Sequence, residues 1–194
     1  MYHDAQRALQ DRFDTRRIAD RLEEVKVHAT LTESDRSFIE SRDMFFLATV
    51  DPEGWPTCSY KGGDPGFVKV VDDTTLAFPC YDGNGMYLSM GNVVSGGKVG
   101  MLFLDFEHPK RIRVEGTAAL NFDDPIKRAW PEAQFVARVT VARVYPNCPL
   151  YIHHYQLVER SKYVPHEGTE TPVPDWKRQP WAVDALPRRR GGAV

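Results

Sequence analysis

The amino-acid sequence predicts a mainly β fold with helices (α+β), built as an antiparallel barrel. About seven runs of strand-type residues follow one another at short spacing. Helical patterns lie near the ends of the chain and in one break after residue 82. A parallel nucleotide-binding sheet would need a helix after almost every strand, so this order favours the antiparallel barrel.

Residues 1–41 are predicted to form an N-terminal helical arm. Residues 4–27 have helical periodicity, and charged side chains fill the other faces, so we expect the arm to lie on a surface. The apolar positions are Leu9, Phe13, Ile18, Leu22 and Val25. A capping box from Thr32 to Asp35 then predicts a second short helix through Ser41.

The barrel is predicted over residues 42–163 and begins with a hairpin. Strand-type residues 44–50 and 57–61 flank the sequence DPEGWP. Pro52 fits the second position of a type I turn and Gly54 the fourth, which predicts a tight connection between two antiparallel strands.

Further strand pairs follow along the chain. The run 66–71 is joined to 74–79 at two aspartates, and 98–106 pairs naturally with 111–120. Asp124 and Pro125 predict the cap and first turn of a short helix. A long strand is then expected over 134–145, with alternate residues from Phe135 to Val141 on one face.

Residues 164–194 are predicted to be an extended, proline-rich C-terminal tail that packs on a surface or is disordered. Trp176 and Trp181 would pin the tail to the barrel. We interpret the sequence RRRGG, residues 188–192, as a solvated end rather than a nucleic-acid site.

Composition excludes several function classes. The net charge of −2 gives no general attraction to nucleic acid or to an anionic membrane. The start of the chain has no apolar signal core, and no membrane-spanning run is expected. Three cysteines without metal-type spacing indicate reduced, buried thiols and a cytoplasmic protein. The adjacent His153 and His154 would point apart in an extended segment, so no metal site is predicted.

The first candidate binding element is the sequence FPCYDGNGMYLSMGN, residues 78–92. It predicts a strand, a turn with two glycines and a short helix that starts near Gly85. The exposed N–H groups of such a helix end can bind an anion, and glycine lets the anion approach closely. The alternative is a turn that needs glycine only for positive φ.

The second candidate element is the strand 57–61. Thr57, Ser59 and Lys61 project to one face in a strand, while Cys58 and Tyr60 project to the other. Two hydroxyls and an ammonium suit phosphate binding if this face meets the glycine turn. The alternative is a solvent-facing strand of an open sheet.

The sequence resembles a known family over most of its length. The runs FFLATVDPEGWPTCSYKGG, TLAFPCYDGNGMYLSMGNV, VGMLFLDFEHPKRIRVEGTA and VYPNCPLYIHHY resemble the pyridoxamine 5'-phosphate oxidase-like flavoproteins, the FMN-binding split barrels. The resemblance implies a six-stranded antiparallel split barrel that forms a homodimer, with FMN in a cleft at the subunit interface.

The resemblance also implies which residues bind FMN. Ser59 and Lys61 match the phosphate-binding strand, and Arg111 falls near the position that contacts the flavin ring. The turn and helix positions are matched by Asn84, Gly85, Met86, Ser89 and Asn92.

The chain differs from the family in its phosphate-binding residues. The true oxidases carry an arginine–lysine pair in the glycine turn, whereas GNGMYLS has no cation. Phosphate affinity would then depend on Lys61 and backbone N–H groups, or on an arginine such as Arg111 or Arg113. The departure also argues against assigning a pyridoxal phosphate substrate.

These observations predict an FMN-dependent oxidoreductase that takes an unidentified small-molecule substrate or electron donor. No side chain stands out as an acid, base or nucleophile, so a non-catalytic flavin- or haem-binding protein for storage or sensing is the alternative. A deazaflavin-dependent reductase is a further one. If the tail crosses to the partner subunit, Trp176 would help to close the flavin cleft, and Lys177 or Arg178 would add positive charge.

Overall fold

Seven antiparallel strands form one open sheet in the order β2-β1-β5-β6-β7-β4-β3 in the computed structural model, which describes residues 1–187. The strands are β1 Met44–Val50, β2 Pro56–Gly62, β3 Lys69–Asp72, β4 Thr75–Cys80, β5 Lys98–Asp105, β6 Lys110–Asn121 and β7 Phe135–Pro146. The predicted antiparallel, mainly β architecture is confirmed. The six-stranded barrel is wrong, because the four-residue β3 adds a strand beside β4 and the edge strands β2 and β3 do not pair.

The predicted hairpins form. Leu47 of β1 lies opposite Ser59 of β2, and the Gly54 N–H donates to the Asp51 carbonyl in the turn between these strands. β3 pairs with β4, and β5 pairs with β6, as the runs of the sequence predict. On β7 the residues Phe135, Ala137, Val139 and Val141 are all buried, as expected.

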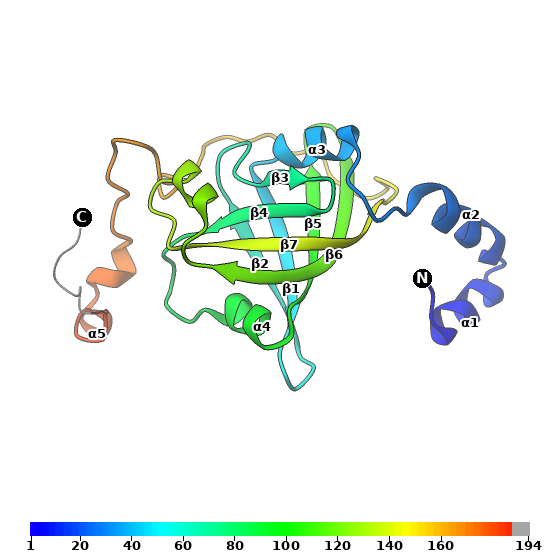
Figure 1. Ribbon diagram of the computed structural model, residues 1–194, viewed down its shortest axis with the longest axis horizontal. Coiled ribbons are helices and arrows are strands. Elements are labelled where there is room, and N and C mark those ends of the chain that lie inside the picture. The colour runs from blue at the N-terminus through cyan, green and yellow to red at the C-terminus, as the bar shows by residue number, and fades with distance from the viewer. Residues whose placement is uncertain (188–194) are drawn as a thin grey trace.

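The sheet bends sharply, so its two halves face each other. In Figure 1, β4 and β7 run across the view, whereas β1 and β5 run nearly upright and β6 curves from one direction to the other. The register between β6 and β7 shifts between Glu115 and Gly116, which is a β-bulge. A side chain at Gly116 would collide with the Thr140 carbonyl oxygen and lie 2.9 Å from Val139 Cγ1. Glycine at this bulge therefore lets β7 approach β6.

Aromatic packing fills the space between the two halves. Phe45 of β1 is fully buried, and its ring centroid lies 5.2 Å from that of Phe103 on β5. On the opposite side it lies 5.1 Å from Phe78 on β4, in an edge-to-face arrangement. Its ring also stacks at 5.8 Å on Phe67, which precedes β3. One side chain therefore joins both halves of the sheet.

The N-terminal arm is two helices rather than one. α1 Asp4–Arg12 and α2 Arg16–Lys26 are separated by Asp14, whose φ of 51° is left-handed and cannot continue a helix. The arm projects from one end of the molecule (Figure 1). The predicted capping box is confirmed: the Asp35 N–H donates to Thr32 Oγ1 at the start of α3 Glu33–Glu40.

The remaining helical segments are short. α4 Leu88–Gly96 follows β4, and a 3₁₀ turn, η1 Pro125–Ala129, begins after the predicted Asp124 cap. The tail contains η2 Asp175–Arg178 and α5 Pro180–Val183. It contacts its own barrel where Thr171 Oγ1 donates to Glu132 at 3.0 Å. The predicted solvated end at 188–192 lies outside the described residues.

Among residues 1–187, every helix is too short or too polar to cross a lipid bilayer. The cysteines differ from expectation, because Cys58 and Cys148 are exposed and only Cys80 is buried. Cys58 lies on the edge strand β2, and Cys148 follows the end of β7. Neither position is covered by another described element.

The bulge generates a stability prediction. We expect Gly116→Ala to lower the free energy of unfolding by about 1–3 kcal/mol, since the new methyl group overpacks a site bounded by backbone. Gly91→Ala is the matched control: a Cβ on this helical glycine meets nothing within 4 Å, so it should raise stability by about 0.5–1 kcal/mol. Urea unfolding of both variants tests the difference. Equal stability of the two would contradict this role for Gly116.

Burial also predicts the reactivity of the thiols. Burial raises the pKa of Cys80 to about 12, so at pH 8 this thiol is almost entirely protonated and shielded. We expect iodoacetamide to label Cys58 and Cys148 in the folded protein and Cys80 only after unfolding. Mass spectrometry of peptides from both states checks this, and rapid labelling of native Cys80 would refute it.

Candidate functional site

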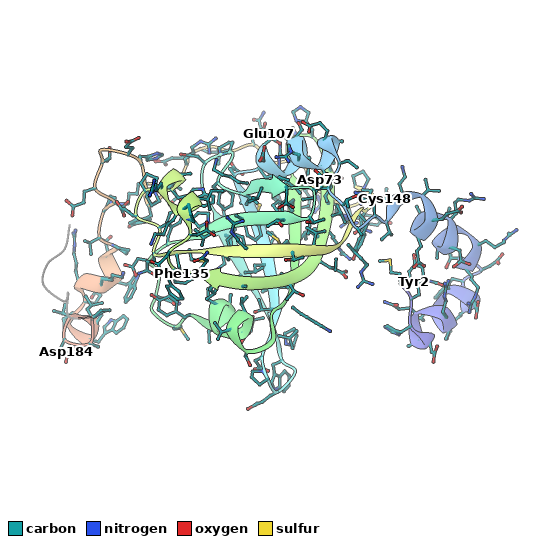
Figure 2. All side chains as sticks on the ribbon, in the orientation of Figure 1. Tyr2, Asp73, Glu107, Phe135, Cys148 and Asp184 are labelled. Carbon is teal, nitrogen blue, oxygen red and sulfur yellow. The ribbon has the colours of Figure 1, made fainter. Side chains whose placement is uncertain are left out.

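A cavity of about 360 Å³ lies between the edge strand β2 and the segment that joins β4 to α4. It brings together the two elements that the sequence singled out. Thr57, Ser59 and Lys61 line it from the strand, and Asn84, Gly85, Met86 and Ser89 from the turn and helix. Phe135, labelled in Figure 2 at the start of β7, forms part of another wall. The structure therefore places these seven predicted residues around one cavity.

The polar face of β2 is formed by alternation. Thr57, Ser59 and Lys61 are half-buried, whereas Cys58 and Tyr60 between them are exposed. Ser59 Oγ lies 2.9 Å from Ser89 Oγ, a hydrogen bond that links β2 to the first turn of α4. This bond fixes the distance between the strand and the helix across the cavity.

A small hydrogen-bond network supports the same wall. Thr49 Oγ1 lies 2.7 Å from Thr57 Oγ1, and Asn92 Nδ2 of α4 donates to Thr49 Oγ1 at 3.1 Å. Asn92 does not line the cavity. Its position indicates that it orients Thr57 from behind, rather than touching a ligand there.

Lys61 carries a cation that the described residues do not neutralise: its ammonium makes no ion pair or hydrogen bond with any of residues 1–187. Burial lowers its pKa, and the nearby Cys80 only partly opposes this shift. A half-buried, unpaired ammonium is costly because burial disfavours the charged form. An anion bound in the cavity would remove that cost.

The glycine turn holds its shape by local contacts. The Met86 N–H donates to Asn84 Oδ1 at 3.0 Å, and Gly85 has a φ of 77°. Tyr87 also has a left-handed φ, 49°, so α4 begins at Leu88 and not near Gly85 as the sequence predicts. No described side chain caps this helix end. Its first N–H groups are therefore open to a ligand.

The cavity is positive at neutral pH. Burial raises the pKa values of Cys80 and Tyr81 to about 12, Tyr81 also through the nearby carboxylates of Asp64 and Glu132. Both side chains are therefore neutral, and no aspartate, glutamate or histidine of the described residues lines the cavity. With the helix end adding partial positive charge, the cavity suits an anionic ligand.

Arg111 and Trp176, the other two predicted ligand-binding residues, lie elsewhere. Arg111 is on β6 opposite Leu104, and its Nε is buried with no hydrogen-bond partner among the described residues. Trp176 stacks on Trp181 with a centroid distance of 6.0 Å. Neither side chain lines the cavity of its own chain.

The tail nevertheless meets the rim of the site. Lys177, next to Trp176, forms an ion pair with Asp82, the residue before the glycines of the turn. Sequence reasoning did not assign this pairing, because the two residues are far apart in the chain. It also missed Tyr81 and Phe135 as wall residues, whose only signal was their place at strand ends.

The comparisons with known proteins concern the same part of the chain. A family model described as pyridoxamine 5'-phosphate oxidase matches residues 31–149. The crystal structure of a candidate pyridoxamine 5'-phosphate oxidase from Lactobacillus delbrueckii has a TM-score of 0.51 and 24% identity, covering 62% of this chain and 99% of its own. This likeness shows the fold alone. The comparison with curated proteins found no match.

Two other solved structures have lower scores. HupZ of Group A Streptococcus shares 22% identity, with 60% of this chain and 93% of its own covered and a TM-score of 0.49. An FMN-binding protein from Syntrophomonas wolfei shares 14%, with 75% and 98% covered and a TM-score of 0.45. The family match spans most of the chain, from α3 through the whole sheet. The chain therefore belongs to the pyridoxamine 5'-phosphate oxidase family.

Proposed function

We propose that this protein binds FMN in the β2–α4 cavity and acts as a flavin-dependent oxidoreductase. The observation that carries the proposal is the unpaired Lys61 ammonium in a cavity whose other wall is a glycine turn and an uncapped helix end. Family membership supports a flavin as the ligand.

The residues present suit the phosphate end of FMN. Lys61 would supply the charge, the hydrogen-bonded Ser59–Ser89 pair one free hydroxyl donor, and the start of α4 the backbone N–H groups. The turn lacks any lysine or arginine of its own, so a single side-chain cation would carry the electrostatic attraction. Tyr81 and Phe135 offer apolar wall surface to the remainder of the ligand.

FMN would supply the redox chemistry, and this chain would position it and exclude water. The cavity offers no carboxylate or imidazole of the described residues as an acid or base. The absence of a carboxylate and an imidazole is compatible with transfer of electrons or hydride, and it equally favours a second candidate, a flavin-storing or flavin-sensing protein without turnover. Oxidation of a nicotinamide donor by the FMN-loaded protein would distinguish the oxidoreductase from the binder.

A homodimer is part of the proposal. The cavity volume is near the lower limit of ligand pockets, about 300–1,000 Å³, so FMN would need a further wall. Exposed apolar side chains surround the mouth: Tyr60 is 62% exposed, Met86 62% and Leu88 57%. A second subunit would cover them. Arg111 does not line its own cavity, so it would reach FMN from the partner subunit, whereas Lys177, the neighbour of Trp176, pairs with Asp82 at the rim of its own cavity.

Binding is tested first with the cofactor itself. We expect the protein to be yellow as purified, or to become so with added FMN at one flavin per chain. FMN at about a hundred times its dissociation constant should add ~2.7 kcal/mol of stability, seen as a higher melting temperature. Haem and a deazaflavin are run in parallel as competitors. No thermal shift with any of the three would remove the cofactor proposal.

The role of Lys61 is tested by comparing FMN with riboflavin, which has the same ring but no phosphate. Lys61→Ala should weaken FMN by roughly ten- to a hundredfold, the cost of a hydrogen bond to a charged group of about 1.5–3 kcal/mol, and change riboflavin affinity little. Lys69→Ala on β3 is the control, because Lys69 does not line the cavity. Fluorescence titration gives both affinities. Equal losses for FMN and riboflavin would place Lys61 away from the phosphate.

A further inference from the structure

The N-terminal arm carries an apolar face that no described part of its own chain covers. α1 and α2 hold each other through polar contacts: the Tyr2 hydroxyl donates to the Ala19 carbonyl at 3.1 Å, and Arg7 pairs with Asp20. The large apolar side chains point outward, with exposed fractions of 58% for Leu9, 69% for Phe13, 55% for Ile18, 48% for Leu22 and 59% for Val25. Their spacing of three and four residues places them in stripes along the helices.

The arm is fixed at its base in a position away from the rest of the fold. His28, just after α2, exchanges two backbone hydrogen bonds with Val144 of β7, at 3.1 and 2.8 Å. Its Nε2 also lies 2.8 Å from the buried carboxylate of Asp35. Figure 1 shows the two helices beyond the end of the sheet, with α4 on a different side of the molecule.

A second apolar surface lies beside α4. A groove of about 450 Å³ runs between α4 and the ends of β6 and β7. Val94 at its edge is 75% exposed and Phe122 is 59% exposed. The floor is aromatic: the ring centroid of Phe135 lies 5.0 Å from that of Phe122 and 6.3 Å from that of Tyr87. Apolar surface of this kind, on both the groove and the arm, indicates an interaction site.

We infer that the α1–α2 arm of a second copy of this chain docks in this groove, with Phe13 as the aromatic anchor. Each chain carries both the projecting apolar face and the groove. In a two-fold symmetric dimer, the arm of each subunit would lie in the groove of the other, so all four surfaces would be covered. Phe13 is the most exposed large apolar residue of the arm, and an aromatic side chain inserted into a pocket is the usual energetic centre of an interface.

Charge favours a protein partner over a lipid surface. Basic and acidic residues are equal in number over residues 1–27, so the arm has no net attraction to an anionic membrane. Salt bridges such as Arg16–Asp11 and Arg21–Glu24 already pair several of these charges within the arm. None of the arm residues lines the β2–α4 cavity, although the groove itself adjoins that cavity through Tyr87, Met90 and Phe135, which line both.

Disulfide trapping tests the contact directly in full-length protein. In a background with Cys58→Ser and Cys148→Ser, one size-tagged chain carries Phe13→Cys and an untagged chain carries Val94→Cys. We expect a mixed disulfide between the two on mild oxidation. A chain with Glu24→Cys, an exposed position off the apolar stripe, is the control and should not form it. Cross-linking of Phe13→Cys only to itself, or of neither site, would overturn the inference.

A double-mutant cycle gives an independent readout. Phe13→Ala and Val94→Ala change exposed side chains, so both variants should fold. Each substitution should weaken self-association at least about tenfold, measured by analytical ultracentrifugation. The double variant should associate no more weakly than either single variant, because both substitutions break the same contact. Val158→Ala, at a 97% exposed apolar position elsewhere, should have no effect. Additive losses, or unchanged association, would refute arm exchange.

Discussion

The packing of Phe45 against Phe78 and Phe103 is the contact on which the rest of the structure depends. A seven-stranded antiparallel sheet that stayed flat would expose one whole apolar face. Here the sheet bends so that β4 faces β1 and β5, and the fully buried Phe45 ring contacts side chains from both halves. The bulge at Gly116 allows the bend, because β6 belongs to both halves and must change direction between them.

The candidate site lies where this bent sheet remains open. β2 has β1 on one side only, so its other edge is free, and α4 occupies part of the gap. Met90 and Val93 anchor α4 in the core, while Ser89 on the same helix contacts Ser59 of β2. The cavity between them is therefore bounded by rigid elements on two sides. Fixed walls of this kind suit the binding of a rigid planar ligand, because little ordering is needed when the ligand enters.

Local patterns in the sequence predicted much of the fold. Alternating strands, the turn around Gly54 and the Thr32 cap are set by near neighbours, and all were found. The left-handed residues Asp14 and Tyr87 were not predicted, since neither is glycine and each is held there by its surroundings. Asp14 divides the arm into two helices, and Tyr87 makes α4 begin at Leu88. The open, seven-stranded sheet was not predicted either, because it depends on pairing between strands far apart in the chain rather than on any single run of residues.

The sequence predicted the site residues correctly where the alternation of a strand determines the face to which each side chain points. The face formed by Thr57, Ser59 and Lys61 was visible in the sequence, because a strand places every second residue on one side. The opposite wall depended on tertiary structure: Tyr81 and Phe135 come from neighbouring strands whose ends meet only in the folded sheet. The exposed thiols of Cys58 and Cys148 were also missed, since exposure at an edge strand is not encoded in a residue's type.

The electrostatics of Lys61 link the stability of the fold to occupancy of the cavity. Its pKa is lowered by burial, so the unfolded chain holds this proton more tightly than the folded one. Below the lowered pKa the ligand-free fold therefore carries a penalty, which declines as the pH rises from that value toward the ordinary pKa of lysine. An anion at the cavity wall removes the same penalty at neutral pH, because it favours the ammonium form in the folded state. Among the residues that the structure describes, Lys61 has no counter-ion. Its charge therefore lowers the stability of the ligand-free protein and strengthens the attraction for an anionic ligand. In a turn without the arginine–lysine pair, that uncompensated charge is the means by which this chain can still hold a phosphate.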